Sequence, residues 1–154
     1  FRRGLAAIGA HDFAFDWQGF DSQFGDLAEL AKAHSGQRFC LVHAGMLTSL
    51  DASTTNAWRE ALQQLVPLDN VFIKVSGLNT FTRQLDEPTM TYVTDTVLDM
   101  FGADRCFYGS NYPVERMWTP LADYTAVQKR IMADRSDQVN QKFFHDTAKA
   151  FYWI

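Results

Sequence analysis

Four short apolar segments recur along the chain, and each is followed by a longer segment with helical spacing. The apolar segments cover residues 13–18, 38–43, 71–76 and 105–110, and they are rich in aromatic or β-branched side chains. Successive segments start roughly 25 to 34 residues apart, which is typical of repeated strand-plus-helix units, whereas hairpin strands are joined by much shorter turns. The pattern therefore predicts a parallel sheet in an α/β fold.

Apolar residues at helical spacing fill the stretches between these segments. After the first segment, Leu27, Leu30 and Ala31 fall on one helical face, and Gly36 follows as a stop signal. Elsewhere a proline or a glycine marks where a helix begins or ends. We expect helices over residues 23–34, 55–66, 87–102, 121–132 and 137–152, with residues 1–10 as the tail of a preceding helix.

Alternation within the third segment separates an apolar face from a polar one. Val71, Ile73 and Val75 share one face, and Lys74 and Ser76 share the other. Branched aliphatic side chains are suited to packing against helices. We therefore expect Lys74 and Ser76 to point into a different environment on the opposite face of the sheet.

The other segments extend this pattern. In residues 13–18, Asp16 and Gln18 fall on the face away from the helices, whereas strict alternation places His43 on the same face as Leu41. The strands thus become polar at their C-terminal ends. The aromatic residues of the last helix, Tyr152 among them, are expected to dock that helix onto the rest of the fold.

Polar strand ends distinguish between two α/β architectures. An open doubly wound sheet has helices on both faces and does not favour polar side chains gathered on one of them. A (β/α)8 (TIM) barrel does, because side chains fill its interior and its chemistry lies at the C-terminal ends of the strands. Since a full barrel takes about 250 residues, four units correspond to half of one. The first residue is Phe rather than Met, so we expect the sequence to begin inside a longer protein.

Composition and charge narrow the function classes. Hydrophobic residues make up 47% of the 154, which is typical of a globular domain, and the net charge of −4 offers no positive field for a nucleic acid. No segment is long and apolar enough for a membrane span or a secretory signal, so we expect a cytoplasmic protein without membrane contacts. Cys40 and Cys106 match no CxxC spacing and are expected to be buried thiols.

Five sequence blocks follow one another in a familiar order: LVHAGM, WREAL, NVFIKVSGL, FGADRCFYGSNYPVERMWT and FFHDTAKAFYWI. Together they resemble the C-terminal half of the amidohydrolase-2 family of metal-dependent hydrolases, which includes sugar lactonases and dicarboxylate-lactone hydrolases. The resemblance extends from about residue 13 to residue 154. It implies that residues 1–154 form one partial TIM-barrel domain with strands five to eight. It also implies that the strand-one HxH metal pair of the family, which this sequence lacks, lies upstream.

The resemblance assigns chemistry to two residues. His43 matches the histidine that ends strand six in the DHAG-like motif, where the family uses it as a metal ligand or to polarise the substrate carbonyl; Val42 stands where the motif commonly has Asp. Asn111 in GSNYP matches an Asp that serves as general base or ligand in GSDxP members. Because an amide neither takes up a proton nor carries the charge that a divalent ion favours, we expect Asn111 to donate a hydrogen bond to the oxyanion or to position water.

These assignments give a catalytic pair and a partial metal site. We predict that His43 and Asn111 are catalytic, and that His43 is also the ligand of a divalent metal such as zinc whose other ligands lie outside this chain. We predict substrate contacts for Gln18, Lys74, Ser76, Arg116 and Trp118. Lys74 and Arg116 would bind anionic groups. Each also has a structural interpretation, since Lys74 would pair with Asp16 and Arg116 would form an exposed pair with Glu115.

The function expected from this resemblance is hydrolysis of a lactone or a related carboxylic ester, with a small-molecule carboxylic substrate. One alternative is a non-catalytic or truncated half-barrel that associates with another half or forms a homo-oligomer, because the open sides of a parallel sheet favour association. A second is a decarboxylase of the same family, which relies on a metal bound by the strand-eight carboxylate and is disfavoured by Asn111. A nucleotide-binding protein is excluded because the sequence has no GxGxxG or GxxxxGK[ST].

Overall fold

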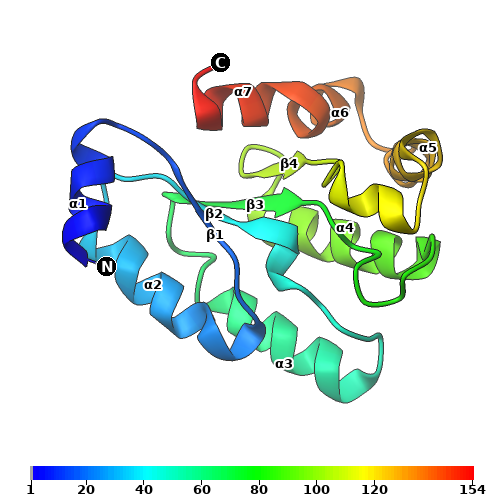
Figure 1. Ribbon diagram of the computed structural model, residues 1–154, viewed down its shortest axis with the longest axis horizontal. Helices are drawn as coiled ribbons and strands as arrows, with labels where there is room; N and C mark the ends of the chain where they lie inside the picture. Colours follow the sequence, from blue (N-terminus) through cyan, green and yellow to red (C-terminus); the bar gives the residue numbers. More distant parts are fainter. Residues whose placement is uncertain (1) are drawn as a thin grey trace.

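Four parallel strands form the centre of the fold. The computed structural model describes residues 2–154, and its strands are β1 (Phe15–Trp17), β2 (Phe39–Leu41), β3 (Val71–Val75) and β4 (Cys106–Tyr108). They lie in the order β1-β2-β3-β4, so that each strand pairs with the next one along the chain (Figure 1). The predicted parallel α/β sheet is confirmed.

Helices connect the strands along one side of the sheet. These connecting helices are α2 (Phe24–Ala33), α3 (Ala52–Gln63) and α4 (Glu87–Phe101), and they lie below the sheet in Figure 1. Before β1 comes α1 (Arg2–Ala10), which confirms the predicted N-terminal helix; residue 1 of that prediction lies outside the described residues. A crossover through a helix is the usual way to join parallel strands.

Further helical segments follow the strands. Short turns follow β1, β2 and β4: η1 (Asp21–Gln23), η2 (Val42–Gly45) and η3 (Val114–Met117). The C-terminal part contains α5 (Leu121–Ile131), α6 (Asp137–Gln141), the π-helical turn η4 (Lys142–Asp146) and α7 (Thr147–Tyr152). The single helix expected over residues 137–152 is therefore interrupted by a wider turn.

Local sequence signals account for the ends of α4. The side chain of Asp86 accepts a hydrogen bond from the backbone N–H of Thr89 at 3.1 Å, which caps the first turn, and Pro88 occupies a position where no N–H is needed. The helix ends at Gly102, whose φ of 73° favours glycine. Both ends agree with the sequence-based expectation.

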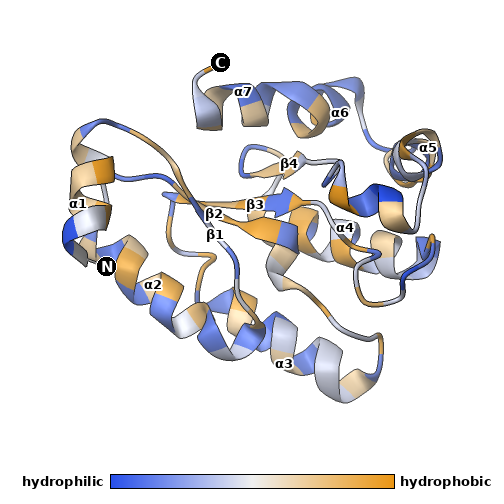
Figure 2. Ribbon diagram, viewed as in Figure 1, coloured by the Kyte–Doolittle hydropathy of each residue, from blue (hydrophilic) through white to orange (hydrophobic). Residues whose placement is uncertain are grey.

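The sheet has two different faces, as the alternation in β3 predicts. Val71, Ile73 and Val75 are fully buried against the connecting helices, within the larger of two apolar clusters. Figure 2 shows hydrophobic residues concentrated along the central strands, while α2 and α3 alternate between hydrophobic and hydrophilic positions. This packing fixes the direction of the other face, where Phe72 and Lys74 point.

The helix α7 covers part of that second face. Phe151 is buried there, with its ring centroid 4.9 Å from that of Phe72 and 5.5 Å from that of Phe107. Cys40 belongs to the same smaller cluster. In Figure 1, α7 accordingly lies on the side of the sheet opposite α2 and α3. The expectation that the last helix docks through its aromatic residues is confirmed for Phe151.

The strand bounds and the two cysteines can be compared with the expectations from the sequence. The strands end earlier than predicted, at Trp17, Leu41, Val75 and Tyr108. Phe13, the first residue of the predicted segment 13–18, lies outside β1 and is 65% exposed. The two cysteines are free and buried as expected, and burial raises their pKa values.

No helix in the described part of the chain has the length and apolar character that crossing a membrane requires.

Candidate active site

A pocket opens where the C-terminal ends of β2, β3 and β4 meet. Its volume is about 480 Å³. It is lined by Val42, His43, Lys74, Ser76, Phe107, Tyr108, Gly109, Asn111, Ala148, Tyr152 and Ile154. Four of the predicted site residues, His43, Lys74, Ser76 and Asn111, thus lie around one cavity. Convergence at the C-terminal ends of parallel strands is where chemistry is found in α/β folds of this kind.

His43 reaches the pocket because the backbone turns sharply after β2. The strand ends at Leu41, and His43 and Ala44 have φ values of 58° and 48°, in the left-handed region. This turn takes His43 out of the alternation that would place it beside Leu41 on the helix-facing side. Its Nδ1 lies 2.8 Å from the Oγ of Ser76 at the end of β3. His43 therefore does not share a face with Leu41, as strict alternation would have it, and it faces the pocket together with the other polar strand ends because of this turn.

The surroundings of His43 favour its neutral form. Burial, and to a smaller extent the nearby positive charge of Lys74, lower the pKa of His43 from its ordinary value of 6.5. Its Nδ1 is engaged by Ser76, while Nε2 has no hydrogen-bond partner among the described residues. A neutral imidazole at this position can donate or accept one hydrogen bond toward the pocket.

Asn111 lies in the turn that follows β4. Its φ is 54°, and its backbone carbonyl accepts a hydrogen bond from the N–H of Glu115 at 3.0 Å. Its side-chain Nδ2 also donates to Oε2 of Glu115 at 3.1 Å. Glu115 is fully buried, so the predicted surface pair with Arg116 is wrong. Sequence reasoning missed this carboxylate because adjacent acidic and basic residues in a loop are usually solvated.

Gly77 brings His43 and Asn111 together. A Cβ atom on Gly77 would lie 2.6 Å from Nδ1 of His43 and 3.0 Å from Nδ2 of Asn111. Both side chains therefore press against the same point of the backbone after β3. The φ of Gly77 is 60°, which also favours glycine.

Lys74, Asp16 and Tyr152 form a second cluster of polar side chains, and two of them, Lys74 and Tyr152, line the pocket. The ammonium group of Lys74 is paired with Oδ2 of Asp16, and the hydroxyl of Tyr152 donates to both carboxylate oxygens of Asp16 at 2.8 and 2.9 Å. The Lys74 Nζ also lies 5.1 Å from the ring centroid of Tyr152. The pairing of Lys74 with Asp16 is thus confirmed, and Tyr152 joins it although the sequence indicated only a docking role.

The remaining candidates lie away from this pocket. Gln18 is exposed and its Nε2 lies 3.2 Å from the Sδ of Met46, at the rim beyond β1. Arg116 and Trp118 line a separate hollow of about 510 Å³ beside η3. The structure therefore does not bring Arg116 or Trp118 together with His43, because the turn after β4 carries them outward.

The described residues do not form a metal centre by themselves. They contain no group of three or more His, Cys, Asp or Glu side chains arranged to hold a metal ion. One nitrogen of His43 is engaged by Ser76, and the amide of Asn111 is engaged by Glu115. The chain thus offers one imidazole nitrogen of His43, and a divalent ion would need its other ligands from elsewhere.

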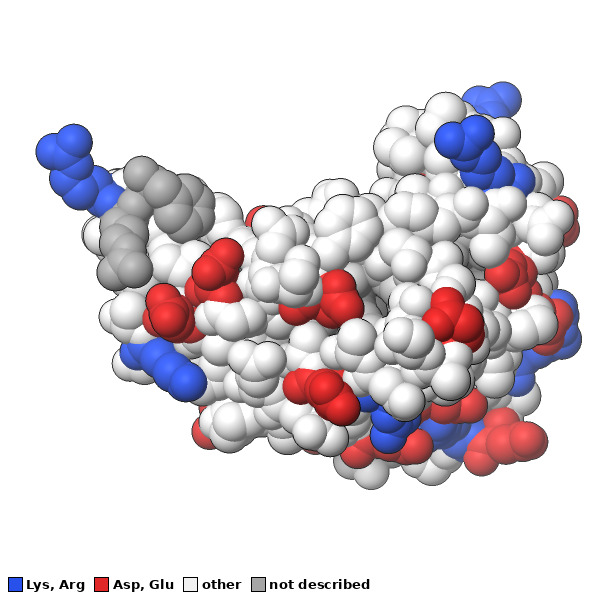
Figure 3. All heavy atoms as spheres, turned by 90° about the horizontal axis from the view of Figure 1, so that it is seen from below, with Lys and Arg blue, Asp and Glu red and all other residues white. Residues whose placement is uncertain are grey.

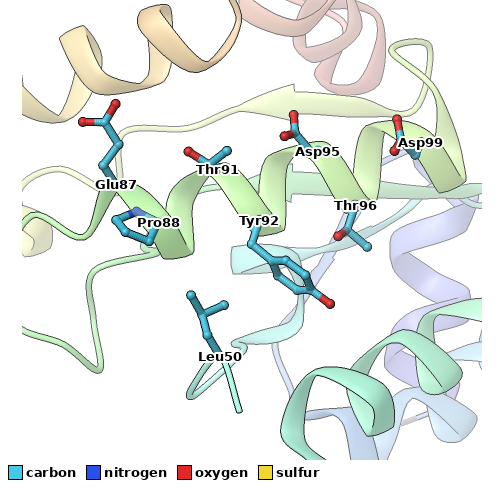
Figure 4. A pocket seen from close by; sticks show the side chains of 8 residues that line it. All are labelled: Leu50, Glu87, Pro88, Thr91, Tyr92, Asp95, Thr96 and Asp99. Atoms are coloured by element: carbon cyan, nitrogen blue, oxygen red, sulfur yellow. The ribbon is translucent and has the colours of Figure 1, made fainter. Parts of the chain in front are cut away.

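A larger hollow beside α4 has no comparable chemistry. It measures about 600 Å³, and Figure 4 shows that its lining side chains point to both sides of α4, with Glu87 and Asp95 on one side and Tyr92 on the other. Glu87 pairs with Arg130 at 2.7 Å, and Asp95 pairs with Arg135 at 2.8 Å. Its acidic groups are thus engaged in surface ion pairs.

Figure 3 shows acidic side chains spread across the middle of one molecular face and basic side chains mostly toward its edges, with uncharged surface between them. This distribution agrees with the modest net charge of −4. It gives that face no extended single-sign field of the kind that gathers a polyanion.

Both the sequence and the fold of this chain are similar to those of known amidohydrolases. The sequence matches the amidohydrolase family over residues 1–154. It is 34% identical over 124 residues to an L-fucono-1,5-lactonase of Burkholderia multivorans, covering 74% of this chain and 42% of that protein. An uncharacterized protein of Sinorhizobium fredii is 26% identical over 153 residues, covering 99% of this chain and 51% of its own length.

Solved amidohydrolase structures are also similar to this chain. An amidohydrolase from Burkholderia multivorans with bound HEPES superposes with a TM-score of 0.91 and 28% identity, covering 99% of this chain and 57% of that chain. A second crystal form with bound zinc gives a TM-score of 0.90 and covers 56% of that chain. The chain thus spans about half the length of the curated relatives it matches.

Proposed function

This chain belongs to the amidohydrolase family, and from that membership and the pocket geometry we propose that it forms strands five to eight of a (β/α)8 barrel that hydrolyses a lactone. In this proposal β1 to β4 are the last four strands of the barrel, and the pocket at their C-terminal ends is the part of the active site that this chain supplies. The proposed activity is that of the complete protein.

The observation that carries the proposal is the meeting of His43 and Asn111 at Gly77. Nδ1 of His43 and Nδ2 of Asn111 both lie against the position that a Cβ of residue 77 would occupy. A carbonyl group of a substrate in the adjoining pocket would be within reach of an imidazole and an amide at once. Two convergent polar groups in a mostly apolar cavity are the usual signature of a small-molecule site.

His43 and Asn111 would share the work of stabilising the transition state. The neutral imidazole, held by Ser76, would polarise the ester carbonyl or accept a proton from water. The amide of Asn111 would donate a hydrogen bond to the developing oxyanion or position the water. Preorganised donors of this kind contribute about 3 kcal/mol each to the barrier reduction.

The charges around the pocket favour an uncharged lactone over a dicarboxylate. Lys74 is already paired with Asp16, and burial keeps His43 neutral. Arg116, which the sequence suggested as a carboxylate clamp, lines the separate hollow beside η3. The described lining therefore supplies no unpaired cation for a substrate carboxylate. The relative named L-fucono-1,5-lactonase is consistent with a sugar-type lactone.

A divalent metal ion is part of this proposal for the complete protein. The solved relative with bound zinc suggests that the complete protein holds a divalent ion. His43 is the ligand that this chain would contribute, and such an ion would polarise the carbonyl or activate water. The other ligands would come from the part of the barrel outside this sequence.

The remaining half of the barrel is proposed to be the partner of this chain. β1 and β4 lie at the two edges of the described sheet, and a closed barrel places four further units between them. Those units would be supplied by the same polypeptide or by another chain. A decarboxylase gains no support from the structure, because an amide at residue 111 carries no charge for a metal.

A substrate panel tests this proposal. Ring opening of a neutral sugar 1,5-lactone and of a lactone dicarboxylate is followed in the complete protein and in its H43A variant. We expect hydrolysis of the neutral lactone, a much lower rate with the dicarboxylate, and loss of turnover in H43A. Unchanged turnover in H43A would remove His43 from the mechanism, and a preference for the dicarboxylate would overturn the proposed substrate class.

A further inference from the structure

The turn after β4 contains a buried carboxylate that the mechanism above does not use. Glu115 has no solvent-exposed surface, and its Oε2 accepts the hydrogen bond from Nδ2 of Asn111 at 3.1 Å. Its Oε1 is buried and has no hydrogen-bond partner among the described residues. A carboxylate kept out of water with one oxygen unpaired is costly for folding, so its presence calls for an explanation.

The chemistry of the two groups fixes the orientation of the amide. The oxygen Oε2 of Glu115 accepts from the amide, and only the nitrogen of an amide side chain can donate. Glu115 therefore holds the nitrogen of Asn111 toward itself. The same nitrogen lies 3.0 Å from the Cβ position of Gly77, on the side of His43. One N–H is thus engaged by Glu115, and the second remains available.

The backbone reinforces this arrangement. The N–H of Glu115 donates to the carbonyl of Asn111 at 3.0 Å, so the turn is closed by a main-chain bond and a side-chain bond between the same two residues. Tyr124, on α5, is buried nearby. Burial, and after it the negative charge of Glu115, raise the pKa of Tyr124, so this neighbour stays neutral.

We propose that Glu115 is a positioning residue for Asn111, holding its amide with the nitrogen turned to the pocket beside His43. This inference rests on the proposed function, in which Asn111 touches the substrate. Glu115 itself does not line the pocket, so it acts only through the amide. Without the carboxylate, the amide would be free to rotate and to exchange its nitrogen and oxygen.

Two substitutions separate this role from a purely structural one. E115Q keeps an oxygen that can accept from Asn111, whereas E115M has a similar length and no acceptor. A positioning role predicts that E115M lowers kcat of the complete protein at least tenfold with KM changed less than twofold, and that E115Q recovers most of the rate. E60Q and E60M make the same changes at an exposed position of α3 and should leave kcat unchanged.

A direct measurement does not require activity. Exchange of the side-chain amide protons with solvent is measured by NMR for Asn111 and for the exposed Asn56 of α3, which serves as reference. We expect the Asn111 protons to exchange at least tenfold more slowly than those of Asn56 in the wild type and in E115Q. Equal exchange rates at the two residues in the wild type would overturn the proposal, even where E115M fails to fold.

The double variant N111A/E115M separates the two hypotheses. Once Asn111 is replaced, E115M should lower kcat no further; a further loss would show that Glu115 acts by another route and overturn its positioning role. Unchanged hydrolysis in N111A alone would contradict the proposed function. In that case slow exchange at Asn111 would still support the contact with Glu115, so the two failures are distinguishable.

Discussion

His43 and Ser76 come from different strand ends 33 residues apart, yet Nδ1 of the imidazole lies 2.8 Å from the serine Oγ. The contact exists because η2 turns His43 away from the helix-facing side while β3 carries Ser76 to the opposite face. It fixes the ring orientation and occupies one of its two nitrogens. The other nitrogen has no hydrogen-bond partner among the described residues.

Replacing Ser76 with Ala should loosen this histidine. We expect S76A to lower the free energy of unfolding by about 1 kcal/mol, because one part-buried hydrogen bond is lost. Hydrolysis by the complete protein should fall with it, since the ring loses its fixed tautomer. Chemical denaturation and the rate of lactone opening check the two effects. S76C keeps a weak donor, so its stability and its rate should lie between those of the wild type and of S76A. Identical rates of lactone opening for all three proteins would contradict a role for this contact.

Acidification should destabilise the wild type through His43. Its pKa in the folded state is lowered below the ordinary 6.5, so the unfolded chain binds this proton first as the pH falls. The free energy of unfolding should therefore decrease from about pH 6.5 down to the folded-state pKa. H43Q should lack this part of the pH dependence. Denaturation curves collected between pH 8 and pH 5 make the comparison, and parallel curves for the two proteins would show that burial does not perturb His43.

A methyl group on Gly77 should disturb both sides of the site. In G77A the new Cβ would lie 2.6 Å from His43, at a φ of 60° that alanine rarely adopts, so we expect a loss of about 1–3 kcal/mol in stability. G36A is the matched control, because nothing lies within 4 Å of its Cβ position. Thermal unfolding of both variants tests this. Equal stability of G77A and G36A would mean that the close approach at Gly77 is not real.

The Lys74–Asp16–Tyr152 group should contribute modestly to stability. D16N leaves the Lys74 ammonium without its carboxylate, and we expect a loss of about 1 kcal/mol, since the Asp16 side chain is 39% exposed and solvent screens the pair. Y152F removes only the hydroxyl and keeps the ring beside Lys74, so its effect should be smaller. Denaturation of D16N, Y152F and the double variant measures the coupling; strictly additive losses would contradict a three-residue group.

The strand pattern could be predicted from the sequence because burial enforces alternation. In β3, Val71, Ile73 and Val75 face the helices and Lys74 faces the other side, as expected. The sequence did not reveal where each strand ends, since a strand end depends on φ and ψ rather than on side-chain type. This is why alternation extended through residue 43 placed His43 beside Leu41, whereas the turn η2 directs it into the pocket.

Two residues of the site were misread for a related reason. Glu115 was expected on the surface, and Tyr152 was expected to serve only for docking. The first is buried because its side chain turns back to Asn111 while the neighbouring Arg116 is exposed, and the second reaches Asp16 because α7 packs on the second face of the sheet. Both contacts depend on tertiary packing that no local spacing encodes. The part of the site outside this chain, the substrate and the cytoplasmic location stay predictions.

A double-mutant cycle on His43 and Asn111 in the complete protein tests the central claim most directly. We predict that H43A and N111A each lower kcat/KM for the neutral lactone about 10²–10³-fold. The double variant should be little slower than the worse single variant, because the two groups act on one transition state. Full activity in either single variant, or losses that simply multiply, would contradict a shared site at the ends of these strands.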